Sequence, residues 1–188
     1  HRGAVDADGK SGDGAGIQIE IAPDFFKEKI LSTGHALDEN KRICVGMVFL
    51  PRTDYSEQEK CREIIESALL DENYYIYGWR QVPIDNSVIG EKANLTRPEI
   101  EQVLFANNVD RPKDFDYSKQ LYLVRRRIEK RIQRQQISDF YICSISFDVI
   151  IYKGLFLAEE LSTFYPDLMN ENFVSSYSIF PQQNLHFY

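Results

Sequence analysis

The hydrophobic and polar positions of the chain follow two spacings, one typical of β-strands and the other typical of α-helices. Isoleucine occupies every second position at the start of residues 17–22, which predicts a strand with one buried face. Residues 43–50 form a nearly continuous apolar run, the pattern of a strand buried on both faces. Aromatic and β-branched residues predict a strand at 74–82 and one or two central strands at 140–152. This contrast implies unequal burial and therefore predicts two sheets packed face to face.

Helical spacing and N-terminal capping signals predict the helices. Pro23 opens a short helix directly after the first strand. The Ser56–Glu59 capping box precedes a helix with one apolar face, which we expect on an outer layer of the fold. The Thr96–Glu99 capping box predicts a further helix with Pro98 in its first turn. Residues 155–164 predict an apolar helix near the end of the chain.

A basic segment occupies residues 121–134. Its first four residues resemble the start of a strand, and the remainder has helical spacing. Such a helix suggests nucleic-acid or membrane binding, or else a solvated face whose long side chains cover apolar surface. The formal net charge of −7 and the pI near 5.0 favour the solvated face, so we expect no nucleic-acid and no membrane partner. The basic residues are Arg125, Arg126, Arg127, Lys130, Arg131 and Arg134.

The length of 188 residues fits one domain over residues 1–188, and an apolar share of 43% is enough for a globular core. Strands and helices occur without a regular βαβ repeat, which predicts an α+β layered fold. Cys44, Cys61 and Cys143 are too widely spaced to suggest a disulfide framework or a zinc site. We interpret them as buried thiols in a reducing cytoplasm.

A glycine-dense polar loop precedes the first strand. Its glycines permit backbone conformations that other residues resist, which indicates either a site or a tight surface turn. A phosphate loop is excluded because Gly3 lies one residue too far from Gly9, and because no strand precedes the loop and no helix follows it. A dinucleotide loop is excluded because the later glycines precede a strand rather than a helix. A calcium loop would need Asp or Asn where Lys10 stands.

Nine segments, taken in chain order, carry a family resemblance: His1–Ala4, Ala7–Asp8, Ser11–Ile17, Val45–Pro51, Gly78–Pro83, Leu121–Arg126, Phe140–Ser144, Ile151–Gly154 and Phe164–Leu168. Together they resemble the glutaminase domain of the glutamate synthase large chain, a class II glutamine amidotransferase, from residue 1 to about residue 180. The resemblance implies a four-layer αββα sandwich of the N-terminal-nucleophile hydrolase type, incomplete at both ends.

The resemblance also implies a reaction, the hydrolysis of glutamine to glutamate and ammonia, with transfer of the ammonia to 2-oxoglutarate in ammonia assimilation. In this family an N-terminal cysteine attacks the side-chain amide, and its α-amino group, with a pKa of about 8, acts as the base. Arg2 and Gly3 match the arginine and glycine that lie beside this nucleophile, where a guanidinium would favour the thiolate. They are the candidate catalytic-site residues.

Two parts of the family's site have no match in this sequence. The nucleophile would lie upstream of His1, and residues 181–188 do not match the glutamine-binding arginine motif or the oxyanion-hole Asn-Gly pair that should follow Phe180. We therefore expect a fragment, from a truncated or frame-shifted reading, that is inactive by itself.

No cofactor is expected in this segment. For the parent enzyme the resemblance implies FMN, an iron–sulfur cluster and either NADPH or ferredoxin as reductant. The implied partners are glutamine, as substrate of the complete domain, and the synthase domains of the same polypeptide, in a cytoplasmic enzyme. The alternative is a non-catalytic amidotransferase-like module that binds a partner or small ligand. A cysteine at the start of the mature polypeptide would distinguish the two.

Overall fold

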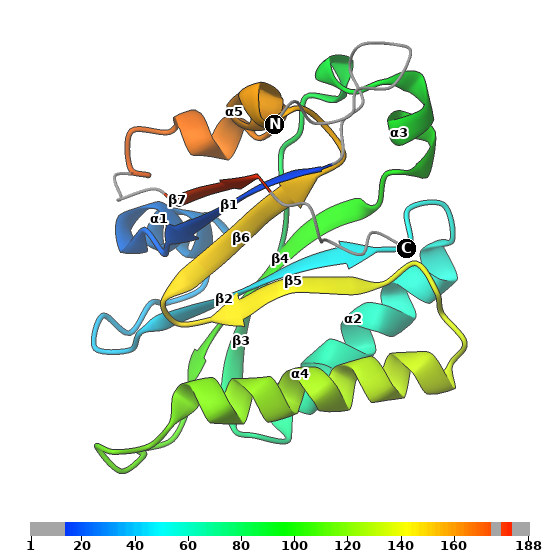
Figure 1. The fold of residues 1–188 in the computed structure, drawn as a ribbon. Coiled ribbons are helices and arrows are strands. Elements are labelled where there is room, and N and C mark those ends of the chain that lie inside the picture. Colours follow the sequence, from blue (N-terminus) through cyan, green and yellow to red (C-terminus); the bar gives the residue numbers. More distant parts are fainter. Residues whose placement is uncertain (1–13, 174–177, 182–188) are drawn as a thin grey trace.

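A computed structural model describes residues 14–173 of the protein and the backbone of residues 178–181. Two antiparallel sheets pack face to face (Figure 1). The small sheet has the strand order β6-β1-β7, and the large sheet has the order β3-β4-β2-β5. The strands are β1 Ala15–Glu20, β2 Ile43–Leu50, β3 Tyr74–Gln81, β4 Glu99–Asn107, β5 Tyr141–Ser146, β6 Val149–Gly154 and β7 Ser178–Pro181.

Helices α2 (Tyr55–Leu70) and α4 (Tyr117–Arg134) lie side by side on the outer face of the large sheet (Figure 1). Helices α1 (Pro23–Ser32) and α5 (Leu161–Phe164) lie toward the small sheet, and α3 (Glu91–Thr96) lies at one end of the molecule. The α+β class and the two stacked antiparallel sheets with helices are therefore confirmed. The predicted outer-layer position of the first long helix is also confirmed.

The core has two parts, and the large sheet separates them. Along β2, alternate side chains such as Val45 and Met47 pack between the sheets, whereas Val48 and Leu50 pack against α2 and α4. This explains the continuous apolar run of β2, because both of its faces are buried. In β1 only one face is buried, so isoleucine alternates with exposed polar residues as the sequence predicts.

A β-bulge in β3 changes which face its side chains occupy. The register with β4 shifts just before Gly78, whose φ of +140° lies in a region that residues with a side chain rarely adopt. Tyr77 consequently packs between the sheets, and Trp79 packs toward α2 and α4. Arg80 is then directed into the space between the sheets, where its ion-pair partner lies.

One predicted helix is wrong, because the Thr96–Glu99 signal marks the end of α3 and the start of β4. Ile100 and Val103 are buried, but on opposite faces of a strand rather than on one face of a helix. The polar residues Glu101 and Gln102 interrupt the apolar run and produce the misleading pattern. Both are buried, at 7% and 0% exposure, because each finds polar partners on its own face of the sheet.

Two boundary predictions are also wrong. Residues 121–124 belong to α4 rather than to a strand, because Leu121 and Val124 continue the buried positions of the helix. Residues 155–164 contain only the 3₁₀ turn Ala158–Glu160 and the single turn of α5, so the apolar run there packs as irregular chain.

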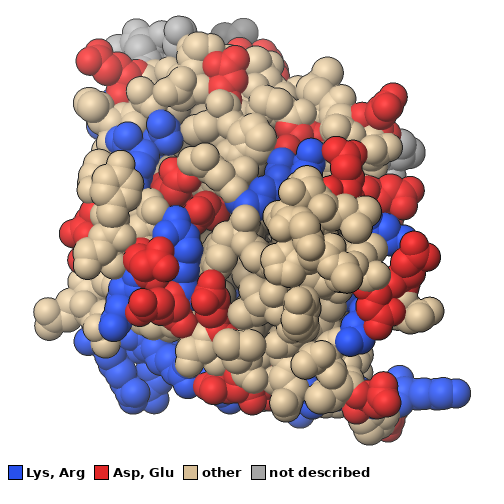
Figure 2. Space-filling model, turned by 180° about the vertical axis from the view of Figure 1, so that it is seen from behind, with Lys and Arg blue, Asp and Glu red and all other residues tan. Residues whose placement is uncertain are grey.

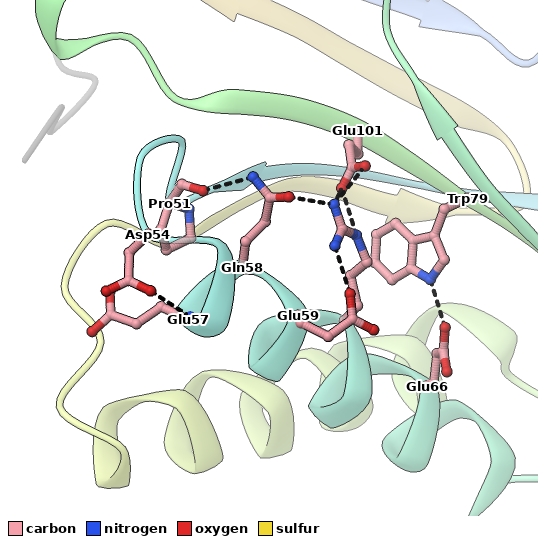
Figure 3. A network of polar contacts seen from close by, with 9 residues as sticks. Pro51, Asp54, Glu57, Gln58, Glu59, Glu66, Trp79 and Glu101 are labelled. Atoms are coloured by element: carbon pink, nitrogen blue, oxygen red, sulfur yellow. Dashed lines mark hydrogen bonds and ion pairs between the residues drawn. The ribbon is translucent and has the colours of Figure 1, made fainter.

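Helix α2 is confirmed, but its predicted cap is not. The N-cap is Asp54, whose side chain accepts a hydrogen bond from the backbone N–H of Glu57 at 2.9 Å (Figure 3). The Ser56–Glu59 capping box therefore does not form, because the helix begins at Tyr55, two residues earlier than that motif requires.

Gly46 of β2 gives a stability prediction. A Cβ at this position would lie 2.6 Å from Cγ1 of Val103 on β4, closer than packed atoms approach. Gly46→Ala should therefore lower the free energy of unfolding by about 1–3 kcal/mol through overpacking. In a double-mutant cycle measured by urea unfolding, Val103→Ala should relieve part of this loss. An unchanged stability of Gly46→Ala would contradict the packing.

Candidate functional site

The candidate residues Arg2 and Gly3 lie outside the described residues, so their roles stay a prediction. The structure does show where the chain arrives after the glycine-rich loop. Strand β1 begins with Ala15, which is paired with Gly154 of β6 on one side and with Pro181 of β7 on the other. The loop therefore enters the small sheet at the end where β6 finishes.

A cavity of about 540 Å³ lies at this end of the fold. It is bounded by the ends of β2, β4 and β6, by α3 and by the chain that follows β6. Most of its lining is apolar, but it also contains three basic side chains and one carboxylate, from Arg52, Arg97, Lys153 and Asp139. A mainly apolar cavity of this size with a few polar groups is typical of a small-molecule site.

Two of the basic side chains have structural roles in the cavity wall. Arg52 donates from Nε to the carbonyl of Arg97 and from Nη2 to the carbonyl of Leu95, both at 3.1 Å, and so holds the chain that leaves α3. Lys153 is 2% exposed, and its Nζ lies 3.7 Å from the ring centroid of Tyr141, a cation–π contact. The cavity wall is therefore held in place partly by its own cations.

A polar network crosses the core between the two sheets. Arg80 of β3 forms a bidentate ion pair with Asp167, with N–O distances of 2.5 and 2.7 Å. The Tyr152 hydroxyl of β6 donates to Asp167 at 3.1 Å and accepts from Nε2 of Gln102 at 3.0 Å. The Arg80 guanidinium also lies over the ring of Phe25. Burial raises the pKa of the Tyr152 hydroxyl, so it stays a neutral donor to the carboxylate.

A second network joins α2 to the outer face of the large sheet (Figure 3). Arg62 makes two hydrogen bonds of 2.9 Å to the carboxylate of Glu101 on β4. Gln58 connects this pair to the end of β2 by donating to the Pro51 carbonyl at 2.9 Å. The group is well placed to fix α2 on the sheet, and we assign it a structural role.

The three cysteines do not form a reactive site. All three are buried, in the two cores. Burial raises the pKa of Cys61 and of Cys143 to about 12, and it raises the pKa of Cys44 well above its ordinary value. Because the thiolate is the nucleophilic form, none of these side chains is suited to attack an amide. The interpretation of three buried thiols is confirmed.

The basic residues of α4 are largely paired with acids. Arg125 and Arg126 both contact Glu129, and Arg127 and Arg131 contact acidic residues at the end of α2 and just after it. On the opposite side from Figure 1, acidic and basic side chains are interspersed, with a larger basic group at the lower left (Figure 2). This pairing favours the solvated-face interpretation of the helix.

The described part of the chain contains neither a membrane-spanning helix nor a cluster of metal ligands. None of the helices there has the length and apolar character needed to cross a membrane. No group of three or more His, Cys, Asp or Glu side chains within residues 14–173 and 178–181 is placed to hold a metal ion.

Two stacked antiparallel sheets, helices on their outer side and a cavity at the end where the chain enters β1 define a layered α+β domain. Residues 1–184 match the family model of the class II glutamine amidotransferases, and the chain belongs to this family. The N-terminal-nucleophile type of fold expected from the sequence agrees with this assignment.

Three similar proteins point to a narrower group within this family, because each of them is a glutamate synthase. Over 97% of its length the chain is 56% identical to the glutamate synthase (NADPH) large chain of Azospirillum brasilense. Over 96% it is 40% identical to the ferredoxin-dependent glutamate synthase of Pyropia yezoensis and 37% identical to chloroplastic ferredoxin-dependent glutamate synthase 2 of Arabidopsis thaliana. The chain spans only 12%, 12% and 11% of these three proteins, so the similarity to the glutamate synthase large chain is partial.

Sequence reasoning missed the network between the sheets. Its members are separated by up to 87 positions in the chain, as in the pair Arg80–Asp167. One available signal was the polar Gln102 in an otherwise apolar segment, since a buried polar residue needs a partner. No pattern in the neighbouring sequence indicated which residue would be this partner.

The buried thiols give a prediction about reactivity. In the folded 188-residue polypeptide, reaction with a disulfide reagent at mildly alkaline pH should be at least about a hundredfold slower than in denaturing guanidinium chloride. The reason is that burial blocks access and keeps the thiols protonated. The rate is followed by absorbance of the released thiolate. A thiol in the folded chain that reacts as fast as a free cysteine would contradict this assignment.

The Arg80–Asp167 pair gives a stability prediction. Asp167→Asn should lower the free energy of unfolding by about 3 kcal/mol, because it leaves the guanidinium in the core without its charge partner. Asp38→Asn is the matched control, since Asp38 and Lys41 form an exposed pair at 3.8 Å and the loss should be under about 0.5 kcal/mol. Urea unfolding followed by Trp79 fluorescence measures both. If both substitutions lowered the free energy of unfolding equally, the buried ion pair would contribute no more to stability than the exposed one.

Proposed function

We propose that the chain is part of the glutaminase domain of a glutamate synthase, in which glutamine is hydrolysed to glutamate and ammonia for transfer to 2-oxoglutarate. The match of residues 1–184 to the class II amidotransferase model is the observation that carries this proposal. The cavity at the end of the small sheet supports it, because β1 leads back from there to the His1–Ala4 motif of the family. Glutamine is thus the proposed substrate of the complete domain.

In this proposal the chain supplies the scaffold and part of the catalytic surroundings. A cysteine that precedes the motif attacks the glutamine amide, with its α-amino group as base. Arg2 and Gly3 lie beside it, and the guanidinium favours the thiolate. Donors outside these 188 residues hold the developing oxyanion.

The 188-residue polypeptide by itself is proposed to be inactive. Its cysteines are Cys44, Cys61 and Cys143, and all of them are buried with raised pKa values. Without an accessible thiol the covalent route is lost.

The remainder of the enzyme is proposed from the relatives, whose names include NADPH-dependent and ferredoxin-dependent forms. Synthase domains of the same polypeptide receive the ammonia and carry the FMN and the iron–sulfur cluster, with NADPH or ferredoxin as reductant. We propose no cofactor for this segment. We propose a cytoplasmic location, on the assumption that the parent enzyme is of the bacterial type.

The second candidate is a non-catalytic amidotransferase-like module that binds a partner or a small ligand. Two observations favour it, the burial of all three thiols and the presence of a mainly apolar cavity whose lining contains none of them. It differs from the first candidate in requiring no nucleophile anywhere in the polypeptide.

Ammonia release from glutamine tests the proposal. Two proteins are compared, the 188-residue polypeptide and a version extended upstream to a family-type N-terminal cysteine and downstream through the arginine and Asn-Gly motifs. The extended protein should turn over glutamine, and the short one should release ammonia at least about a thousandfold more slowly.

The extended protein with its N-terminal cysteine changed to alanine is the control, and it should be as inactive as the short chain. Equal turnover by the short and extended proteins would show that the chemistry lies elsewhere. A folded extended protein without any turnover would favour the non-catalytic module.

A further inference from the structure

Arg97 presents unused hydrogen-bond donors at the cavity. Its Nε donates to the side-chain oxygen of Asn94 at 2.9 Å, but its two terminal nitrogens have no hydrogen-bond partner among the described residues. Arg52, beside it, uses Nε and Nη2 on backbone carbonyls and leaves Nη1 without a described partner. Within residues 14–173 neither guanidinium forms an ion pair with a carboxylate.

This arrangement differs from that of the other arginines that reach into the fold. Arg62 is paired with Glu101, and Arg80 is paired with Asp167. Partial burial and the neighbouring positive charge of Arg52 lower the pKa of Arg97, and the charge of Glu99 offsets only part of this effect. The charged form of Arg97 is therefore less well stabilised than in water. An anion between the two side chains would remove this disadvantage.

The geometry of the donors favours a carboxylate. A guanidinium offers two parallel N–H groups that match the two oxygens of a carboxylate. Apart from Asp139 and Lys153 the adjoining cavity wall is mainly apolar, with Ile89, Phe156 and Phe164. The ligand's remaining part would therefore be a short carbon chain or an apolar side chain. The volume of about 540 Å³ is sufficient for a molecule of amino-acid size.

We propose that Arg97, supported by Arg52, forms a carboxylate-binding subsite at this cavity. The carboxylate has two possible sources, the α-carboxylate of a free amino acid such as glutamine or an acidic side chain from another part of a longer polypeptide. Only the choice of glutamine as the source of the carboxylate rests on the proposed function. The subsite itself rests on the two arginines and the cavity.

NMR of the arginine Nε–Hε groups in the 188-residue polypeptide tests the subsite. The Arg97 signal is assigned by its loss in Arg97→Gln, and the amide spectrum of each variant checks that it is folded. Acetate, L-glutamine, N-acetylglutamate amide and L-glutaminamide are titrated. The carboxylates should shift the Arg97 signal saturably in the millimolar range, and L-glutaminamide, which lacks a carboxylate, should not.

Arg97→Gln should weaken carboxylate binding by at least about tenfold. Its affinity is measured from the backbone amide signals of the residues that line the cavity. Arg97→Lys, which keeps the charge but loses the fork, should bind with intermediate affinity. Arg126→Gln is the matched control, because its exposed side chain on α4 contacts Glu129 and is not part of the cavity lining. If Arg97→Gln does not fold, the loss of the Nε–Hε signal in Arg97→Lys gives the assignment, and the comparison of glutamine with glutaminamide on the unsubstituted chain decides the question.

The ligand series separates the two sources. Preference for glutamine over N-acetylglutamate amide assigns the subsite to a free amino acid, and the reverse preference assigns it to a protein side chain. Absence of any carboxylate-dependent shift, or equal binding by Arg97→Gln and the unsubstituted chain, overturns the proposal. Neither result bears on the proposed function, because ammonia release by the extended protein is measured independently.

Discussion

Burial of the large sheet on both of its faces is the constraint on which the rest of the structure depends. Strand β2 is buried at all eight of its positions, and β4 is buried at seven of nine. A strand in this position cannot leave polar side chains to water, so each must find a partner within the fold. The sheet therefore determines where the polar networks lie as well as where the two cores lie.

The two polar residues of β4 show how this requirement is met. Glu101 and Gln102 are consecutive, so their side chains point to opposite faces of the sheet. Glu101 meets Arg62 from α2, and Gln102 meets Tyr152 from β6. One dipeptide thereby connects the central strand to the helical layer on one side and to the small sheet on the other. Because each connection has a defined geometry, the networks specify the relative positions of three layers.

Most of the fold could be predicted from the sequence, and the largest error has a clear physical cause. Strands β1 and β2 and helix α2 follow periodicities set by burial on one or two faces. The predicted helix at Thr96–Glu99 failed because Glu101 and Gln102 gave a buried strand the polar positions expected of a helix. Local patterns indicate which positions are buried. They do not indicate whether a residue far away in the sequence supplies the hydrogen-bond partner of a buried polar side chain.

The candidate site was less predictable, because its parts converge only in three dimensions. The family resemblance suggested a chemistry and the candidate residues Arg2 and Gly3, which stay predictions, but no periodicity indicated the cavity formed by the ends of β2, β4 and β6. No local pattern in the sequence distinguished Asp167 or Arg97 either, because their importance comes from the partners they have or lack.

The distribution of thiols and cations suggests how the chain could serve the family's reaction. All three cysteines contribute to the cores, where a reactive thiolate would be unstable, so the catalytic thiol in our proposal must be a further residue. Unlike the thiols, three basic side chains line the cavity, those of Arg52, Arg97 and Lys153. The chain as a whole has a net charge of −7. A cavity with positive charge at its wall favours anionic groups even when the molecule as a whole repels them, because the nearest charges dominate in a partly desolvated site. A substrate that carries a carboxylate would therefore be drawn to the same end of the small sheet at which the family's motif leads into β1.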